Sequence, residues 1–352
     1  MDATIILFER SGARMRASAA QARHEVTRDK AFHSPGEAEP RQKRKVKHRD
    51  WSGATLALLI GLGGLVLGRL GTLWIRFDVF SQFAMQFALL CAAGAIGLFM
   101  PRFKGVITGV LFAGLVALYG LWPYLATSGV ELPLQQGEKR LRVMQFNVHG
   151  GAVSVDEALA TITAIGPDVV SLVEIDEHNK PLLEVLKTRW PYQATCWEIS
   201  GCETAVISKL PLSAPQSQAY WEGPNYTLAT LGSDYGNLRL VATHTTRFPF
   251  ARAQLIQVKA LARLLEGGGA LIVMGDFNAT PFSRITDGFS ASLGLQRQTS
   301  MPSWPANRFT PQLAIDHIFT SAGIRALDHE IAGQPSGSDH LPIALTLAVP
   351  VH

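Results

Sequence analysis

Three apolar segments in series constrain this chain more than any other feature of its sequence. They run over about 52–73, 80–100 and 106–125. Each is close to the roughly 20 residues that an α-helix needs to cross a bilayer. Glycines recur within them, and small residues let helices pack closely in lipid. The segments predict three transmembrane helices, and the alternative that the pattern leaves open is a buried helical hairpin of a soluble protein.

Basic residues are distributed unequally around these segments. Residues 41–49 hold a dense run of Lys and Arg before the first segment, and the short loop 101–104 holds two more. In the other loop, Arg76 is balanced by Asp78. The positive-inside rule therefore predicts a multi-pass protein of the inner (plasma) membrane, with a cytoplasmic amino terminus and a periplasmic or extracellular region after Leu125.

Composition divides the rest of the chain. Residues 1–50 are polar and basic without apolar periodicity, so we expect a disordered cytoplasmic tail, within which Met15 is an alternative start. This tail supplies most of the net charge of +4, which makes that charge weak evidence for nucleic-acid binding. We expect a membrane domain at 51–125, a linker at 126–139 and an α/β domain at 140–352.

The α/β domain is indicated by strand-like runs that alternate with helical patterns. The expected strands cover 141–147, 168–174, 204–208, 238–244, 270–278, 314–320 and 343–349. Apolar residues at helical spacing predict helices at 154–165 and around 255–265. About 210 residues are enough for a complete hydrophobic core.

Cys196 and Cys202 bracket a short loop within this domain. Three cysteines in the whole chain are too few for a disulfide scaffold. In the cytosol the two would be unrelated thiols, but a disulfide persists in an oxidising space. The predicted topology therefore favours a bridge between them.

The apolar run 270–274 ends abruptly in Gly-Asp-Phe-Asn. Alternate residues of a strand share a face, so a strand that continues to Asn278 points Asp276 and Asn278 to one side. A carboxylate accepts protons and an amide donates to phosphate oxygens, which suits a site for water and phosphate. The alternative is that these residue types only form a turn.

Other chemically useful side chains stand at or near the ends of the expected strands. They are Asn147, Glu174, His244, Asp316, Asp339 and His340. Each has an ordinary alternative role when taken singly, as a turn residue, an exposed acid or a half-buried histidine. Their recurrence at strand after strand favours one shared site.

The order of these motifs and the residues within them resemble those of the endonuclease/exonuclease/phosphatase superfamily of deoxyribonuclease-like phosphoesterases. The matching segments are Gln145-Phe146-Asn147, Val173-Glu174, Thr243-His244, Gly275-Asp276-Phe277-Asn278, Ile315-Asp316-His317-Ile318 and Gly337-Ser338-Asp339-His340-Leu341-Pro342-Ile343. They cover about 140–349 and leave the membrane half outside the resemblance. The resemblance implies a four-layer α/β/β/α sandwich, here preceded by three transmembrane helices.

The resemblance also implies a metal site. Glu174 would be the main carboxylate on Mg²⁺, or on Mn²⁺, with Asn147 and Asp339 near it. A hard cation takes oxygen ligands and keeps places for water and phosphate. His149, although close to Asn147, matches no motif residue and is left out of the predicted site.

Catalytic roles follow from the same resemblance. Asp276 would position or deprotonate the attacking water, and Asn278 would steady the phosphate. His340, oriented by Asp316, would contact the phosphate or act as general base. Which of Asp276 and His340 takes the proton is left open. His244 would contact the phosphate from the opposite side or act as general acid.

The predicted function is that of a membrane-anchored, divalent-metal-dependent phosphoesterase that hydrolyses a phosphodiester of nucleic acid or of a lipid headgroup. Glu203, at the start of the expected strand 204–208, is expected to hold the ring of His244 in position. The domain has no Lys/Arg-rich stripe of the kind that duplex-binding proteins use. The alternative is a catalytically inactive membrane-bound interaction module with the same fold, and the intact set of site residues argues against it.

Overall fold

The computed structural model describes residues 52–100, 104–126, 129, 131–149, 153–196, 199–307 and 310–351. The predicted cytoplasmic tail, Trp51 and the loop residue Arg102 lie outside the described residues, as does part of the predicted linker.

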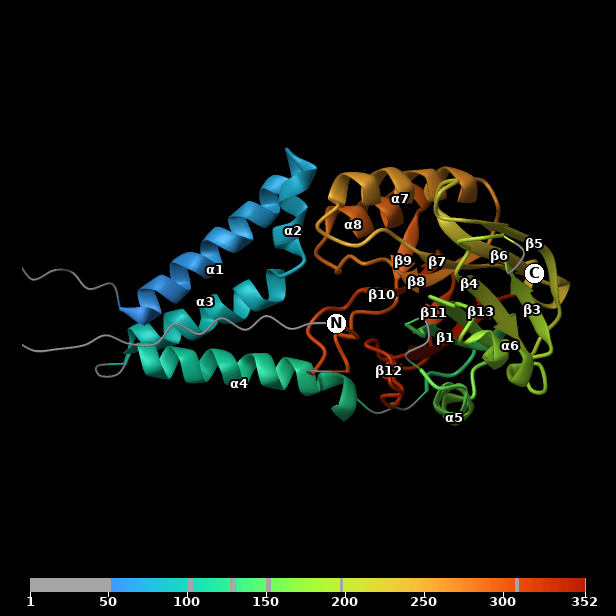
Figure 1. The fold of residues 1–352 in the computed structure, drawn as a ribbon, viewed down its shortest axis with the longest axis horizontal. Coiled ribbons are helices and arrows are strands. Elements are labelled where there is room, and N and C mark those ends of the chain that lie inside the picture. The colour runs from blue at the N-terminus through green and yellow to red at the C-terminus, as the bar shows by residue number, and fades with distance from the viewer. Residues whose placement is uncertain are drawn as a thin grey trace, which may run out of the picture. The chain divides into compact units, whose positions relative to one another are not determined.

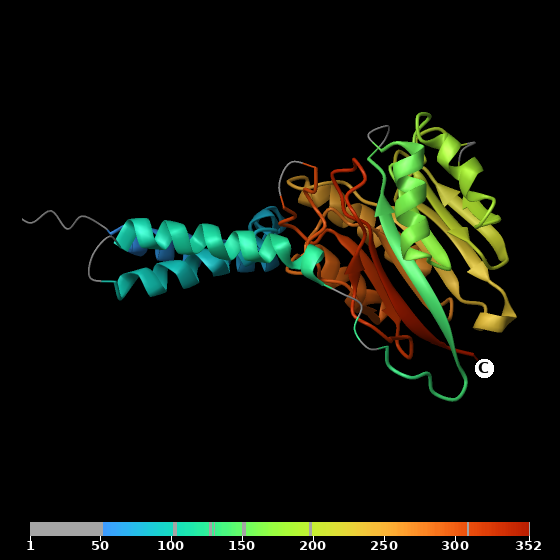
Figure 2. The same ribbon diagram turned by 90° about the horizontal axis from the view of Figure 1, so that it is seen from below.

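The apolar part of the chain is helical, as predicted (Figures 1 and 2). Its elements are α1 (Gly53–Arg69), η1 (Leu70–Thr72), η2 (Ile75–Phe77), α2 (Asp78–Ser81), α3 (Ala84–Leu98) and α4 (Lys104–Leu125). The stretch Gly53–Thr72 and helix α4 are long and apolar enough to cross a membrane. The 15 residues of α3 extend about 22 Å, which is short of a bilayer core of about 30 Å.

The middle segment differs from the single straight span that its hydropathy predicts. It qualifies as a span only when Ile75–Ser81 is joined to α3 across a bend of 55°. Two or three helical segments are therefore long enough to cross, and the number of crossings stays a prediction.

Glycines allow α1 and α3 to pack closely. A Cβ on Gly61 would lie 2.7 Å from the carbonyl oxygen of Phe87, and one on Gly94 would lie 2.8 Å from the amide nitrogen of Leu58. Real side chains do not tolerate such distances, so glycine is needed at both positions. This close contact agrees with the role expected of small residues between helices in lipid.

The second half of the chain forms two β-sheets. The described residues of one sheet have the strand order β11-β13-β1-β2-β4-β3, with β12 paired to β13, and those of the other have the order β5-β6-β7-β8-β10-β9. The strands of the first sheet are β1 (Glu138–Asn147), β2 (Val169–Val173), β3 (Tyr192–Thr195), β4 (Thr204–Ser208), β11 (Arg325–Ala326), β12 (Ile331–Ala332) and β13 (Ile343–Pro350). Those of the second are β5 (Leu212–Gln218), β6 (Asn225–Leu231), β7 (Arg239–His244), β8 (Leu271–Asp276), β9 (Leu295–Arg297) and β10 (Asp316–Ser321).

The sheets pack face to face with helices on both outer sides, which confirms the four-layer sandwich. Buried side chains from both sheets, among them Val143 of β1 and Met274 of β8, form the core between them. The outer helices are α5 (Val155–Ile165), α6 (Lys180–Leu186), α7 (Ala251–Leu265) and α8 (Arg284–Leu293), with a short η3 turn at Ser233–Tyr235. Helices α5 and α6 cover the first sheet, and α7 and α8 cover the second.

Local sequence sets the limits of these helices. The Oγ of Ser154 accepts a hydrogen bond from the amide of Glu157 at 3.2 Å and begins α5. Gly166 ends the same helix at φ +66°, in the left-handed region that favours glycine. Ser283 begins α8 in the same way as Ser154 begins α5, with a 3.1 Å bond from the amide of Ile285.

Each of the seven expected strands is present, although their ends differ by up to three residues. β8 ends at Asp276, so the expectation of a strand through Asn278 is wrong. Asn278 instead has φ +47° and lies in a turn after the strand. Cys196 and Cys202 form the predicted disulfide, with 5.6 Å between their Cα atoms.

Candidate active site

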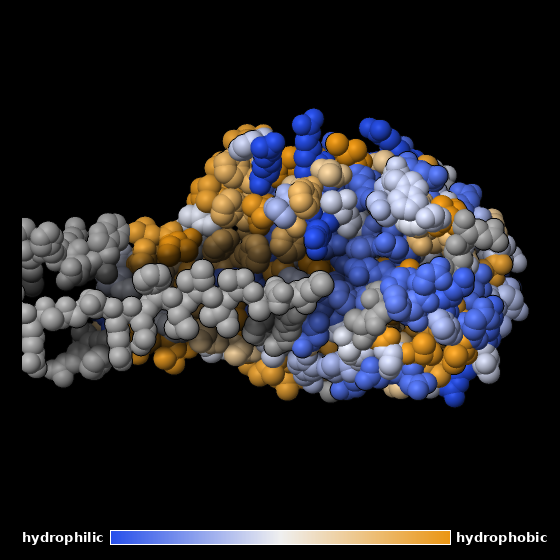
Figure 3. Space-filling view, in the orientation of Figure 1, coloured by the Kyte–Doolittle hydropathy of each residue, from blue (hydrophilic) through white to orange (hydrophobic). Residues whose placement is uncertain are grey.

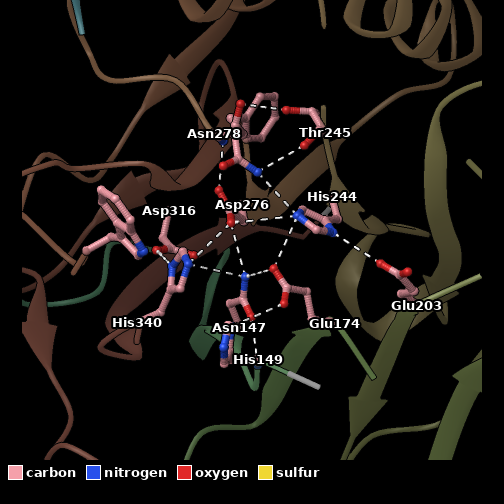
Figure 4. A network of polar contacts seen from close by, with 12 residues as sticks. Asn147, His149, Glu174, Glu203, His244, Thr245, Asp276, Asn278, Asp316 and His340 are labelled. Atoms are coloured by element: carbon pink, nitrogen blue, oxygen red, sulfur yellow. Dashed lines mark hydrogen bonds and ion pairs between the residues drawn. The ribbon is translucent and has the colours of Figure 1, made fainter. Parts of the chain in front are cut away.

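The predicted site residues meet at one end of the sandwich, where central strands of both sheets end (Figure 4). β1 runs parallel to β2, and β7 runs parallel to β8 with His244 opposite Asp276. β10 is antiparallel to β8 and places Asp316 opposite Asp276 from the other side. A Cβ at Gly275 would overlap the carbonyl oxygen of Thr243, so this glycine permits the close approach of β7 and β8.

Asp276 lies at the centre of the cluster with a side chain only 1% exposed. Its Oδ2 accepts a hydrogen bond from Asn147 Nδ2 at 3.1 Å. The Nε2 atoms of His340 and His244 lie 3.6 and 3.8 Å from the same oxygen. Burial raises the pKa of Asp276 to about 6, which the two histidines oppose.

Asn278 joins the site through the turn rather than through a strand. Its amide donates to Asp276 Oδ1 at 2.7 Å, so the aspartate side chain holds the turn. Its Nδ2 donates to the carbonyl of Thr245 at 3.0 Å and lies 3.2 Å from His244 Nε2. The two side chains therefore face one spot, as predicted, for a different geometric reason.

His340 is fixed by a buried aspartate. Its Nδ1 lies 2.8 Å from Asp316 Oδ2, which also accepts a 2.6 Å bond from Ser303 Oγ. Burial opposes a charge on this ring, but Asp316 and Asp276 outweigh it and raise the pKa of His340 to about 10. Burial likewise works against the charge of Asp316, and His340 nonetheless lowers the pKa of that carboxyl.

His244 stands on the opposite side of Asp276 from His340 in Figure 4. Its Nδ1 lies 3.4 Å from Glu203 Oε2, the contact that the sequence predicts, and its Nε2 lies 3.5 Å from Glu174 Oε1. Burial disfavours the charged ring, but the hydrogen bond to Glu203 and the nearby carboxylates raise the pKa of His244 to about 9.

Asn147 connects the carboxylates of the two sheets. Its Nδ2 donates to Glu174 Oε1 at 2.8 Å as well as to Asp276. Its Oδ1 accepts from the backbone amide of His149 at 2.8 Å, a donor that fixes the orientation of the amide group. Asn147 thus acts here as a donor between carboxylates, and the predicted place near a metal stays a prediction.

His149 is the residue that sequence reasoning missed. Its Nδ1 lies 2.9 Å from Asp339 Oδ1 and 3.6 Å from Glu174 Oε2, between the two predicted metal carboxylates. His149 has φ +46° and Glu174 has φ +57°, both unusual for these residue types. His149 lies two residues after Asn147, and this short distance in the sequence was the only indication of its role. The turn that brings the two side chains to the same site cannot be recognised from the sequence.

The donor set on this side suits a hard divalent cation. Asp339 Oδ1 is buried and contacts only the ring of His149 closely among the described side chains, while Oδ2 accepts a hydrogen bond from Trp304 Nε1 at 2.9 Å. Glu174 keeps a side chain 27% exposed beside it. Carboxylate oxygens without full hydrogen bonding, partly open to solvent, are what Mg²⁺ or Mn²⁺ binds. The cluster of acidic and histidine side chains around Glu174 and Asp276 therefore fits a divalent cation, and the individual ligands stay a prediction.

These groups form the floor of an open cleft of about 950 Å³. Its lining includes Glu174, Asp276, Asp339 and His340 together with the apolar segment Phe248–Pro249–Phe250. A cleft of this size accommodates a substituted phosphate ester.

The fold is similar to several solved structures. Beta toxin from Staphylococcus aureus is 15% identical, with a TM-score of 0.48 over 58% of this chain and 99% of that one. Sphingomyelinase C from Streptomyces griseocarneus is 16% identical, with a TM-score of 0.46 over 59% and 99%. TDP2 of D. rerio, complexed with single-strand DNA product, is 16% identical, with a TM-score of 0.48 over 59% and 99%. Identities this low concern the fold alone.

A comparison with curated proteins found no match. The sequence model of the Endonuclease/Exonuclease/phosphatase family, in contrast, matches residues 144–340, more than half of the chain. The matched range begins in β1 and ends at His340, so it contains the whole cluster around Asp276. The chain belongs to the endonuclease/exonuclease/phosphatase family.

Proposed function

We propose that this protein is a membrane-anchored, divalent-metal-dependent phosphoesterase that hydrolyses a phosphodiester by attack of water. The observation that carries the proposal is the surroundings of Asp276. A buried carboxylate at the floor of an open cleft has an amide and two imidazoles within 3.8 Å of one oxygen. A structural aspartate needs no such convergence of titratable groups on a cleft.

Asp276 is the proposed base. At neutral pH the ring of His340, with a pKa of about 10, keeps its proton and cannot accept another. Asp276, with a pKa of about 6, is ionised above that pH and accepts the proton of the attacking water. His340 then serves as a cationic donor to the phosphate, held in place by Asp316.

His244 and Asn278 complete the reaction from the other side. The water oxygen bonds to phosphorus, its proton goes to Asp276, and the ester P–O bond breaks. His244, charged because its pKa is about 9, donates a proton so that the departing oxygen leaves as an alcohol. Asn278 Nδ2 lies beside His244 and donates to a phosphate oxygen.

Glu174 and Asp339 are the proposed ligands of Mg²⁺ or Mn²⁺. The ion supplies positive charge that stabilises the phosphate oxygens. Asn147 holds the Glu174 carboxylate in position through its 2.8 Å hydrogen bond. His149 lies between the two ligands and orients them.

The helices α1, α3 and α4 are the proposed membrane anchor, with the catalytic domain in the periplasm or at the cell exterior. The apolar character of Gly53–Thr72 and Lys104–Leu125 supports the anchor. The Cys196–Cys202 disulfide supports the compartment, because such bonds persist where the surroundings are oxidising.

The test uses the full-length protein in detergent micelles with bis-p-nitrophenyl phosphate, a soluble diester. Turnover is measured with Mg²⁺, with Mn²⁺ and with EDTA. The variant Asp276→Asn removes the base while keeping the shape of the side chain. Asp234→Asn is the matched control, because that carboxylate is 85% exposed and lies outside the cleft.

The proposal requires metal-dependent turnover that Asp276→Asn abolishes and Asp234→Asn preserves. Folded protein without metal-dependent turnover of any phosphoester would instead support the inactive interaction module.

A further inference from the structure

The turn between α1 and α3 is joined to the catalytic domain by a buried carboxylate. Asp78 is fully buried, and its Oδ2 accepts from Ser283 Oγ at 2.5 Å. Its Oδ1 accepts from the amide of Arg284 at 2.8 Å, at the first turn of α8. A carboxylate at a helix amino terminus is stabilised by the unpaired amides and the helix dipole. The contact is therefore a specific attachment between the two parts.

Further hydrogen bonds tie the helices to both loops that flank the cleft. Gln82 Oε1 accepts from the amide of Thr280 at 2.7 Å, only two residues after Asn278. Gln86 Nε2 donates to the carbonyl of Gln312 at 2.7 Å, on the loop that follows Trp304. The cleft is thus held in a set orientation relative to the helices.

An aromatic chain continues from the helices into the cleft. The ring of Phe83, at the start of α3, lies 5.9 Å from that of Phe248, which lies 6.4 Å from that of Trp304. Phe248 and Trp304 both line the cleft, and Trp304 donates to Asp339. One wall of the cleft is therefore an apolar surface that leads from the helices to the proposed metal ligands.

Exposed tryptophans lie where α1 and α4 end beside the catalytic domain. Trp74, in the turn after α1, is 52% exposed, and Trp122, in the last turn of α4, is 38% exposed. Tryptophan favours the interface between lipid and water. Both lie at the ends of the helices that face the catalytic domain, and Figure 3 shows apolar residues gathered over the helices. The membrane surface is then next to the cleft.

The charge of the cleft argues against a polyanion. Of the described residues that line it, Arg247 alone is a lysine or arginine, against five acidic residues. The acidic residues are Glu174, Asp176, Glu203, Asp276 and Asp339. A protein that follows a nucleic-acid backbone neutralises several phosphates with Lys and Arg. One arginine, together with the two charged histidines at the floor of the cleft, provides for a single phosphate group rather than for successive phosphates of a backbone.

From these observations, we infer that the substrate is a phosphoester lipid of the same bilayer that holds the helices. The inference rests on the proposed function and names its substrate class. The acyl chains stay in the leaflet and along the exposed rings of Phe250 and Phe282, which are 59% and 44% exposed. The headgroup phosphate enters the cleft along the Phe248 wall and reaches Asp276.

The first experiment reconstitutes the full-length protein into vesicles of phosphatidylcholine, phosphatidylethanolamine and phosphatidylglycerol, with Mg²⁺. Isotope-labelled lipids are placed either in the same vesicles or in separate protein-free vesicles, and products are measured by mass spectrometry. Bis-p-nitrophenyl phosphate and a single-stranded oligonucleotide are assayed in parallel. We expect cleavage of lipid in the shared vesicle at least tenfold faster than in the separate one.

Each other outcome has a defined meaning. Cleavage of the oligonucleotide with a higher kcat/KM than any lipid would overturn the inference, and so would equal cleavage in both kinds of vesicle. If the soluble diester is hydrolysed with dependence on Asp276 but no lipid is, the proposed function stands and the inference fails. If no phosphoester is hydrolysed, the proposed function itself fails.

A pair of variants tests the apolar route. Phe250→Ser removes an exposed ring at the cleft, and we expect it to lower kcat/KM for lipid by about tenfold or more, with a smaller effect on the soluble diester. Leu264→Ser is the control, because Leu264 is 52% exposed on the last turn of α7, roughly 20 Å along the helix from Ala251. Equal effects of Phe250→Ser on lipid and soluble diester would contradict the route.

Discussion

The active site has two halves, which differ in how deeply their side chains are buried and in how fully those side chains are hydrogen-bonded. In the proton half (Asp276, Asp316 and His340) the side chains are 1–5% exposed and held by hydrogen bonds of 2.6–3.1 Å. In the ligand half (Glu174, Asp339 and His149) they are 18–44% exposed, and Asp339 Oδ1 faces the ring of His149 at 2.9 Å.

The two halves differ because their proposed tasks require different surroundings. Groups that move protons need fixed positions and shifted pKa values, and burial provides both. Groups that bind a metal need oxygens left free for it and places left for water. The same end of the sandwich provides both environments, one on each side of Asn147.

Removal of metal should have the largest effect, because it acts on the ligand half as a whole. EDTA should abolish turnover, and Mg²⁺ should raise the thermal unfolding midpoint of the wild-type protein by mass action. Glu174→Gln should lose this thermal shift, whereas Asp316→Asn should keep it. If both variants keep the shift, the ion is not held by the ligand half.

Asp276→Asn should lower kcat by about 10² to 10⁴ fold, the usual contribution of a general base. Thermal stabilisation by Mg²⁺ should survive, since the ligand half is intact. Turnover and unfolding are measured on the same preparation, with Asp234→Asn as control. A decrease in kcat of less than tenfold would show that Asp276 is not the general base.

The value of kcat/KM should rise with pH as Asp276 ionises. The midpoint of this rise should lie at pH 6 or below, because a bound cation favours the charged carboxylate. The value of kcat/KM should fall as His244, with a pKa of about 9, and then His340, with a pKa of about 10, lose their protons. Asp316→Asn removes a charge that raises the pKa of His340, so His340 should lose its proton at or before His244 and the alkaline fall should begin at lower pH. An unmoved alkaline limb would show that the proton of His340 is not needed.

Asp78→Asn should have the smallest effect, because it weakens one attachment and leaves the site chemistry unchanged. The loss of charge at the start of α8 should cost about 1–2 kcal/mol and lower the unfolding midpoint by a few degrees. We expect kcat for the soluble diester to fall a few fold with KM unchanged. Asp156→Asn, the same change in the first turn of α5, is the matched control, and equal effects of the two would exclude a positioning role for Asp78.

The sequence is sufficient to predict the proton half. Asp276 ends a strand with a strong apolar pattern, Asp316 begins one and His340 precedes one, and the order of those strands brings the three side chains together. Strand β6 was missed because Asn225, Tyr226 and Thr227 lack an apolar alternation, although all three are buried in the folded domain, Tyr226 under the outer helices.

The ligand half and the attachment to the helices are harder to predict for physical reasons. The position of His149 depends on a backbone with positive φ, which the sequence pattern does not encode for histidine. In the sequence Asp78 is only a loop charge that opposes Arg76. Its partners Ser283 and Arg284 are about 200 residues away, and pairing at that separation depends on the finished fold.

The contact at Asp78 bears on whether the two parts of this protein are interchangeable modules. A simple tether is replaceable by any other, because it contributes only proximity to the membrane. Here the exchange of α1–α4 for a foreign anchor would deprive Ser283 and Thr280 of their partners and leave a buried face of the catalytic domain open to water. The helices and the catalytic domain are therefore two parts of one packed structure and not interchangeable modules.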